Sequence, residues 1–155
     1  MIVLIGYGNP LRRDDGAGPV LARMVEAWGG RDDMTVLTPH QLVPELAEDL
    51  AASGVTAVVF LDAAVNDREG GGMVAIRPVD GEQASPLFGH HFSPGDLLQY
   101  VQLLRGTALP AWQITIPGND FGYGEGFSRF AEQNLAAAFA ALQTFLCHIP
   151  RQTPG

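Results

Sequence analysis

A glycine-rich and acidic segment, Gly6-Tyr7-Gly8-Asn9-Pro10-Leu11-Arg12-Arg13-Asp14-Asp15-Gly16-Ala17-Gly18, joins an apolar run to an amphipathic one. The run before it, Ile2-Val3-Leu4-Ile5, is typical of a short buried strand. The segment after it, from Pro19 to Trp28, has apolar residues at helical spacing. A strand, a turn and a helix in this order begin an open α/β sheet, which binds ligands at the carboxyl ends of its strands. Two adjacent carboxylates therefore lie at the end of the sheet where ligands bind.

The rest of the chain continues to alternate between expected strands and helices. Further strands are expected at 34–37, 55–61, 73–77 and 112–116, and further helices at 44–53, 94–104 and 127–147. Ser93 is the expected cap of the helix that begins at Pro94. This alternation predicts an α/β three-layer sandwich, in which a mostly parallel, twisted sheet of about five strands has helices on both faces. We expect one domain over 1–150 and a disordered tail at 151–155.

Composition limits the partners and the compartment. The 155 residues are 46% hydrophobic, which suits one domain with a sizeable core. The net charge of −8, with only nine scattered basic residues, argues against a nucleic-acid partner. Cys147 is the one cysteine, so internal disulfides and cysteine-rich zinc sites are excluded. We also find no basic leader and no apolar run long enough to span a membrane, and we expect a cytoplasmic protein.

Acidic and imidazole side chains follow three of the expected strands. Asp14 and Asp15 come after the first strand, Asp62 ends the third, and His90 and His91 follow the fourth. The expected topology brings these positions to one rim of the sheet. Carboxylate oxygens with an imidazole nitrogen suit nickel or zinc, and three protein ligands leave positions open for a substrate. The sequence therefore predicts a divalent metal site at this rim.

Each of these side chains also has a structural interpretation. A lone Asp before a helix caps it and complements its dipole. Two adjacent Asp residues need two explanations, so we assign Asp14 to structure and Asp15 to the site. Asp62 could instead accept hydrogen bonds from loop amides. Adjacent side chains diverge, so only one of His90 and His91 is expected to reach the site.

A nucleotide site is the alternative for the glycines of the first turn. Gly6 and Gly8 begin the dinucleotide pattern G-x-G-x-x-G, but Leu11 stands where the third glycine belongs. Asp32 or Asp33 has the spacing of the carboxylate that would hold a ribose. We do not favour nucleotide binding, because the motif fails where helix and strand must pack closely.

Taken together, these motifs resemble the hydrogenase maturation endopeptidases, which trim the large subunit of nickel-iron hydrogenases. The resemblance covers nearly the whole chain. Its motifs are Gly6-Tyr7-Gly8-Asn9-Pro10-Leu11 with Asp14-Asp15-Gly16, Gln41-Leu42 with Pro44-Glu45, Asp62-Ala63, His90 with Phe92-Ser93-Pro94 and Leu97-Leu98, and Gly122-Tyr123-Gly124-Glu125-Gly126-Phe127-Ser128.

The resemblance implies an activity and a site. The activity is removal of a C-terminal extension from the large-subunit precursor after nickel has been inserted. The implied metal contacts, which are also the implied catalytic residues, are Asp15, Asp62 and His90, the last because it stands three residues before Ser93 as in the family. The nickel is expected to arrive with the precursor, and zinc or another divalent cation could substitute. The expected partner is therefore the precursor, with no membrane and no nucleic acid, and the protein is expected to be a monomer.

Two rival functions remain open at the level of sequence. Peptidyl-tRNA hydrolases have a similar fold and also end their first strand in a Gly-x-Gly-Asn-Pro turn, but they place a histidine and basic residues around it. Here Asp14-Asp15 follows the turn and the chain is acidic. A non-cleaving nickel-binding assembly factor for the same precursor is the second rival. No feature of the sequence excludes it.

Overall fold

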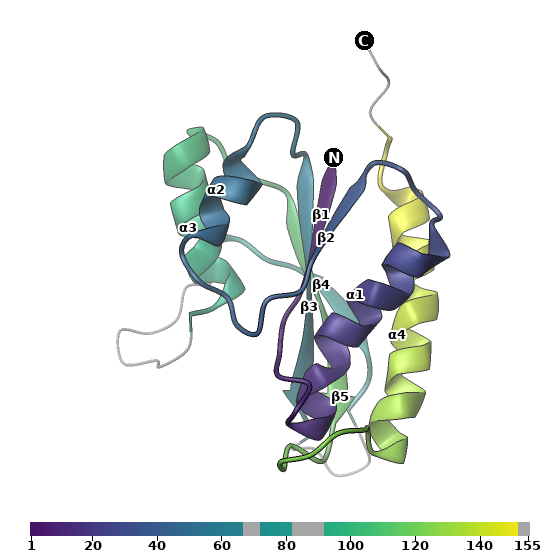
Figure 1. Cartoon of the computed structure of the whole chain (residues 1–155). Coiled ribbons are helices and arrows are strands. Elements are labelled where there is room, and N and C mark those ends of the chain that lie inside the picture. The colour runs from purple at the N-terminus through teal and green to yellow at the C-terminus, as the bar shows by residue number, and fades with distance from the viewer. Residues whose placement is uncertain (67–71, 82–91, 152–155) are drawn as a thin grey trace.

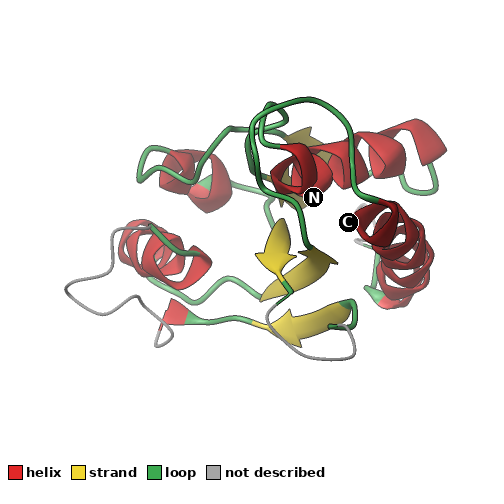
Figure 2. Cartoon of the chain, turned by 90° about the horizontal axis from the view of Figure 1, so that it is seen from below, coloured by secondary structure: helices red, strands yellow, loops and turns green. Residues whose placement is uncertain are grey.

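The computed structural model describes residues 1–66, 72–81 and 92–151, and it has three layers (Figure 1). A five-stranded sheet lies in the middle, with α1 and α4 over one face and α2 and α3 over the other (Figure 2). The strands are β1 (Ile2–Gly6), β2 (Met34–Leu37), β3 (Ala57–Val65), β4 (Ala75–Pro78) and β5 (Ala111–Gly118). The helices are the 3-10 turn η1 (Arg13–Gly16), α1 (Ala17–Trp28), α2 (Leu46–Ala51), α3 (Pro94–Arg105) and α4 (Arg129–His148).

The strand order is β2-β1-β3-β5-β4. The first four strands in this order are parallel, and β4 is an antiparallel edge strand against β5. The carboxyl ends of β1, β3 and β5 therefore share one rim, which is at the bottom of Figure 1. The predicted α/β fold with a mostly parallel five-stranded sheet is confirmed.

Two apolar cores hold the helices against the sheet, one on each face. Leu4 of β1 and Val59 of β3 belong to the core under α1 and α4, whereas Ile5 and Phe60 belong to the core under α2 and α3. Successive side chains of a strand point to opposite faces. The central strands are apolar on both faces because both faces are covered, which is why they read as continuous hydrophobic runs.

Helix α1 packs unusually close to the ends of β1 and β3. A Cβ added to Gly18 would overlap the carbonyl oxygens of Leu61 and Tyr7, and one added to Gly6 would overlap the carbonyl oxygen of Gly18. The close helix–strand contact thus uses Gly6 and Gly18, and it does not need the missing third glycine of the dinucleotide motif.

Two elements differ from the sequence prediction. Strand β3 continues past Leu61 to Val65, because residues 62–65 pair with 115–118 of β5, so Asp62 lies within the strand instead of ending it. Helix α2 is shorter than the predicted 44–53. Leu46 and Ala47 donate to the carbonyls of Val43 and Pro44 in a turn that precedes the helix.

The other helix ends follow local chemistry. Ser93 caps α3 in a reciprocal capping box, with the N–H of Asp96 donating to Ser93 Oγ at 3.1 Å and the N–H of Ser93 donating to Asp96 Oδ2 at 2.8 Å. Arg151, at the start of the predicted tail, donates to the Gly30 carbonyl, and residues 152–155 lie outside the described part. Within the described residues, no helix combines the length and the apolar character needed to cross a membrane.

Candidate functional site

The turn after β1 holds the carboxylate of Asp15. The N–H of Asn9 donates to Asp15 Oδ2 at 2.7 Å, and Asn9 Oδ1 accepts from the N–H of Leu11 at 3.0 Å. Gly8 allows the backbone to pass this close, since its φ is 144° and a Cβ there would overlap the carbonyl oxygen of Asp15. Asp15 is half-buried, and within the described residues its Oδ1 accepts no hydrogen bond. This oxygen can therefore accept a ligand.

The neighbouring carboxylate, Asp14, is fully buried and holds the glycine-rich loop in place. It accepts hydrogen bonds from the N–H groups of Asn119, Asp120 and Ser128 at 2.8–2.9 Å, and from Ser128 Oγ at 2.6 Å. Burial opposes ionisation, but these hydrogen bonds, led by those from Ser128, lower the pKa of Asp14 below its usual value. Asp14 is thus structural, as expected, although it anchors a loop and does not cap α1.

Asp62 belongs to a polar network on the face of the sheet that carries α2 and α3. Side chains two residues apart in a strand share a face, so Asp62 points to the same side as Phe60. Tyr7 Oη donates to Asp62 Oδ2 at 3.0 Å, and Gln113 Nε2 donates to Tyr7 Oη at 3.4 Å. The network joins the turn after β1 to Asp62 of β3 and Gln113 of β5.

The ionisation of Asp62 is strongly affected by its surroundings. Burial raises the pKa of Asp62 to about 7, the negative charge of Asp15 adds to this increase, and the hydrogen bond from Tyr7 opposes it. Burial and the charge of Asp62 also raise the pKa of Tyr7 well above its usual range, so the phenol remains a hydrogen-bond donor. Asp15 and Asp62 are therefore close enough to affect each other, and together they favour a cation between them.

The described structure thus brings together two of the three predicted site residues. Asp15, in the turn η1 that follows β1, and Asp62, in the neighbouring strand β3, lie at the same rim. His90 and His91 lie outside the described residues. Within 1–66, 72–81 and 92–151, no three His, Cys, Asp or Glu side chains form a group that could hold a metal ion.

Sequence reasoning did not identify Tyr7 and Gln113 as members of the site. Tyr7 stands inside the quoted motif, two residues after Ile5, so strand alternation already places it on the α2–α3 face. Gln113 is a polar residue in a mostly apolar strand, and this is the signal that could have found it. Its contact with Tyr7 depends on the pairing of Gln113 with Phe60, which requires the strand order.

The carboxylates that a nucleotide site would need are already engaged elsewhere. Asp33 forms a bidentate pair with Arg31 at 2.8 and 2.7 Å, and Asp32 lies 3.3 Å from Arg151. Neither pair is at the rim of Asp15 and Asp62. The structure therefore gives no support to the dinucleotide interpretation of the glycines.

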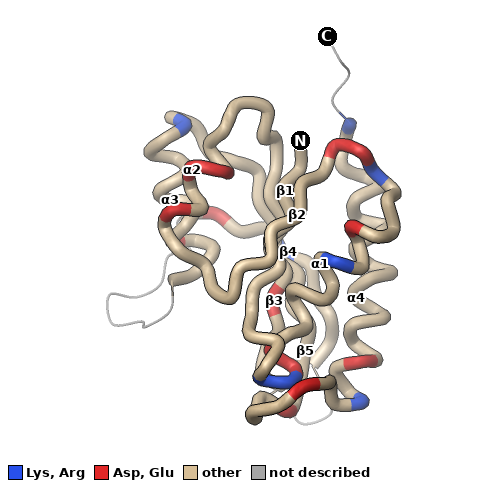
Figure 3. The backbone as a smooth tube through the Cα atoms, in the orientation of Figure 1, with Lys and Arg blue, Asp and Glu red and all other residues tan. Residues whose placement is uncertain are grey.

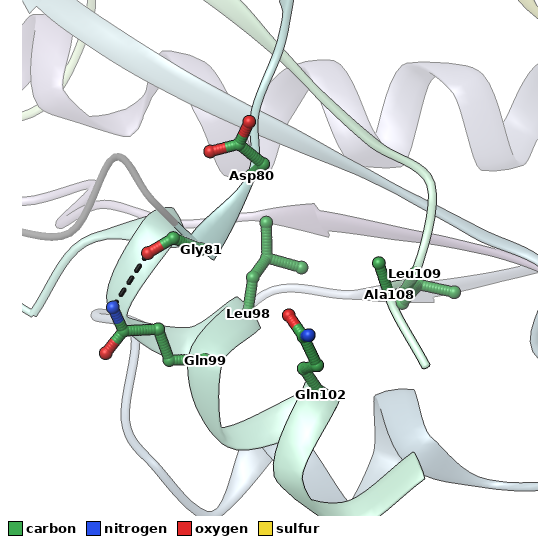
Figure 4. Close-up of a pocket in the computed structure, with 7 residues that line it drawn as sticks. All are labelled: Asp80, Gly81, Leu98, Gln99, Gln102, Ala108 and Leu109. Carbon is green, nitrogen blue, oxygen red and sulfur yellow. Dashed lines mark hydrogen bonds between the residues drawn. The ribbon is translucent and has the colours of Figure 1, made fainter. Parts of the chain in front are cut away.

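Of two cavities in the described part of the chain, one lies beside this rim and the other lies away from it. One of about 610 Å³ lies beside Gly8 and Pro10, between α1 and Thr38, and is lined mainly by apolar side chains. Another of about 530 Å³ lies between Leu98 of α3 and the residues that follow β4 (Figure 4). Because β4 is antiparallel to β5, the residues that follow β4 lie at the opposite rim of the sheet from Asp15 and Asp62. This second cavity is therefore not part of the site.

Comparison with known proteins finds similarity to solved structures. No protein-family model matches the sequence, and no curated protein matches it either. Solved structures do match. The maturation protease HycI from Thermococcus kodakarensis KOD1 has a TM-score of 0.71 at 21% identity, with 95% of this chain and 92% of that chain covered. The maturating endopeptidase HybD from E. coli has a TM-score of 0.71 at 20% identity, with coverages of 94% and 91%.

A third structure extends the similarity. The hydrogenase 2 maturation peptidase from Thaumarchaeota archaeon SCGC_AB-539-E09 has a TM-score of 0.66 at 18% identity, with coverages of 94% and 97%. The chain has the fold of the NiFe hydrogenase maturation proteases. The matches extend over nearly the full length of both chains.

Proposed function

We propose that this protein is a hydrogenase maturation protease, an endopeptidase that removes the C-terminal extension of a NiFe hydrogenase large-subunit precursor once nickel is in place. The observation that carries the proposal is the pair of carboxylates, Asp15 and Asp62, held at one rim of this particular fold. The resemblance of the motifs and the similarity of the fold support the same activity independently.

Each residue has a role in the proposed reaction. Asp15 and Asp62 supply oxygen ligands to the nickel of the precursor, and His90 supplies a nitrogen ligand. Tyr7 fixes the orientation of the Asp62 carboxylate through its hydrogen bond, as outer-shell partners of metal ligands commonly do. The nickel belongs to the precursor as cargo, and the protease completes its coordination during docking.

This arrangement also accounts for selection of the loaded precursor. Two neighbouring carboxylates are costly to bury under a docked protein when no cation neutralises them. A precursor that carries nickel removes this cost, whereas an empty one leaves it in full. The rim therefore discriminates between the two precursors by the charge that each presents.

The proposal is tested by incubating the protein with nickel-loaded precursor and measuring the intact mass of the large subunit. Wild type is expected to remove the extension. Asp15→Asn, Asp62→Asn and His90→Ala are each expected to slow cleavage about 100-fold or more while remaining folded, because each removes a ligand of the shared metal.

Two matched controls make the result specific. Asp49→Asn changes an exposed carboxylate on α2, away from the rim, and is expected to cleave at the wild-type rate. His91→Ala is expected to retain most of the activity. An inactive His91→Ala variant beside an active His90→Ala variant would move the proposed nitrogen ligand by one residue, and a wild type that cleaves nothing would refute the protease function.

A further inference from the structure

A third cavity, referred to below as the cleft, lies directly beside the network of Asp62, Tyr7 and Gln113. It has a volume of about 320 Å³ and is formed by the rim ends of β3 and β5, the strand β4 and the residues that precede β4. Polar side chains line much of it, among them Asn66, Arg77, Gln113 and Thr115. This volume is at the lower end of the range for specific ligand pockets and fits a few residues of extended peptide, not a folded protein.

Strand pairing connects this cleft to the site. Asp62 of β3 pairs with Thr115 of β5, and Gln113, two residues away, pairs with Arg77 of β4. Paired residues on adjacent strands present their side chains on the same face, so all four lie on one side of the sheet. Gln113 also donates to Tyr7, which donates to Asp62. A peptide in this cleft therefore lies next to the proposed reaction centre.

Arg77 is a cation without a partner in the part of this acidic chain that the structure describes. Most of the described arginines have a partner: Arg13, Arg23, Arg31 and Arg151 pair with carboxylates, Arg105 donates to a backbone carbonyl, and Arg12 lies over the ring of Tyr123. Arg77 is exposed and has no hydrogen bond or ion pair within the described part of the chain. Its guanidinium is thus available for a ligand, and a carboxylate is the group whose geometry it matches best.

We propose that this cleft binds the C-terminal extension of the precursor and that Arg77 pairs with a carboxylate of that extension. The inference rests on the proposed protease function and names the part of the substrate that this surface recognises. An extended tail suits the size of the cleft, and its own carboxylates complement the charge of Arg77, which has no partner among the described residues. Arg77 would act by binding the substrate, without contact with the reacting atoms.

The test measures binding of a synthetic peptide with the sequence of the extension, separately from cleavage. Wild type is expected to bind the peptide, and Arg77→Gln is expected to raise its Kd about tenfold, the effect of losing one charge-assisted pair. Arg129→Gln is the matched control, because Arg129 is also exposed and has no partner within the described residues. It is expected to bind like wild type.

A second peptide tests the chemistry of the contact. When every carboxylate of the peptide is replaced by an amide, wild type is expected to bind it as weakly as Arg77→Gln binds the original, and Arg77→Gln is expected not to distinguish the two peptides. Equal affinity of wild type for both peptides, or an unchanged Kd in Arg77→Gln, would overturn the inference. If wild type cleaves loaded precursor and Arg77→Gln cleaves it with the same KM, only this inference fails. If wild type does not cleave at all, the protease function fails first.

Discussion

Asp14 and Asp15 are neighbours in the sequence but have opposite environments. Asp14 is fully buried and accepts four hydrogen bonds, whereas Asp15 is half-buried and accepts one from Asn9. The two adjacent carboxylates therefore have separate roles. Asp14 fixes the loop that leads to α4, and Asp15 faces the rim.

Removal of the buried carboxylate is expected to be costly. Asp14→Ala leaves the N–H groups of residues 119, 120 and 128 without their acceptor, and the free energy of unfolding should fall by about 3 kcal/mol. Urea denaturation measures this loss. Asp32→Ala, which removes a carboxylate with a 94% exposed side chain, is the control and should change stability by less than about 0.5 kcal/mol. Equal stability of the two variants would contradict the anchoring role.

The raised pKa of Asp62 predicts that its contribution to stability depends on pH with the opposite sign to that of Asp14. A lowered pKa makes Asp14 stabilising above its unfolded pKa, and this stabilisation is lost as the pH falls through the folded value. Asp62 has a pKa raised to about 7, so the folded state binds the extra proton and stability falls as the pH rises from about 4 to about 7.

The Asp62→Asn variant isolates this effect, because it removes the titrating group and keeps the shape of the side chain. The stability of the metal-free variant relative to wild type is expected to increase by about 2 kcal/mol between pH 5 and pH 8. Thermal or urea denaturation at the two pH values measures it. A difference between variant and wild type that does not change with pH would show that Asp62 has an ordinary pKa.

At the scale of elements, the ends of the helices and of most strands were predicted to within two residues, and the C-terminal end of β3 is the exception. The strand at Met34–Leu37 has the predicted bounds, because a short, mostly apolar run between polar turns is typical of a strand. The extension of β3 to Val65 was not predicted, because it depends on pairing with β5, a partner distant in sequence. The antiparallel direction of β4 likewise depends on tertiary pairing and leaves no mark in local periodicity.

The C-terminal end of α4 is held by a buried cation that the sequence does not reveal. Arg31 is 6% exposed, and its Nη1 donates to the carbonyls of Leu146 and Ile149 at 2.6 Å each, while its other nitrogens bind Asp33. A cation at this position satisfies helix carbonyls that have no partner within the helix and complements the helix dipole.

Arg31→Ala is expected to lower the free energy of unfolding by about 3 kcal/mol, because it leaves buried carbonyls and a carboxylate without their donor. Amide hydrogen exchange in the last turn of α4 should also become faster than in wild type. Arg23→Ala, which removes an exposed arginine paired with Glu26 on α1, should change stability by less than about 0.5 kcal/mol. Similar losses in both variants would show that Arg31 is no more than a surface charge.

At the scale of the whole molecule, parallel strand topology explains why the site could be partly predicted from the sequence. Acidic groups that follow or end parallel strands share a rim whatever their separation along the chain, and this reasoning placed Asp15 and Asp62 together. The hydrogen bonds of Tyr7 and Gln113 could not be predicted in the same way, because they depend on strand order and register. The predicted contribution of His90 remains a prediction.

The charge distribution is also informative at this scale. The chain has a net charge of −8, and acidic and basic segments lie side by side at the lower end of the molecule, where the rim is found (Figure 3). A docking protein therefore meets a mixed surface of carboxylates and arginines. Nickel would neutralise the rim carboxylates, and Arg77 of β4 would pair with a carboxylate of the extension, so one precursor can satisfy both.

The central claim is that the rim carboxylates recognise the metal of the client. The most direct test compares nickel-loaded and nickel-free forms of the same precursor, incubated with the wild-type protein under identical conditions and analysed by intact mass. The loaded form is expected to lose its C-terminal extension, and the nickel-free form is expected to keep its mass. Cleavage of both forms at the same rate would show that the rim carboxylates do not recognise the metal.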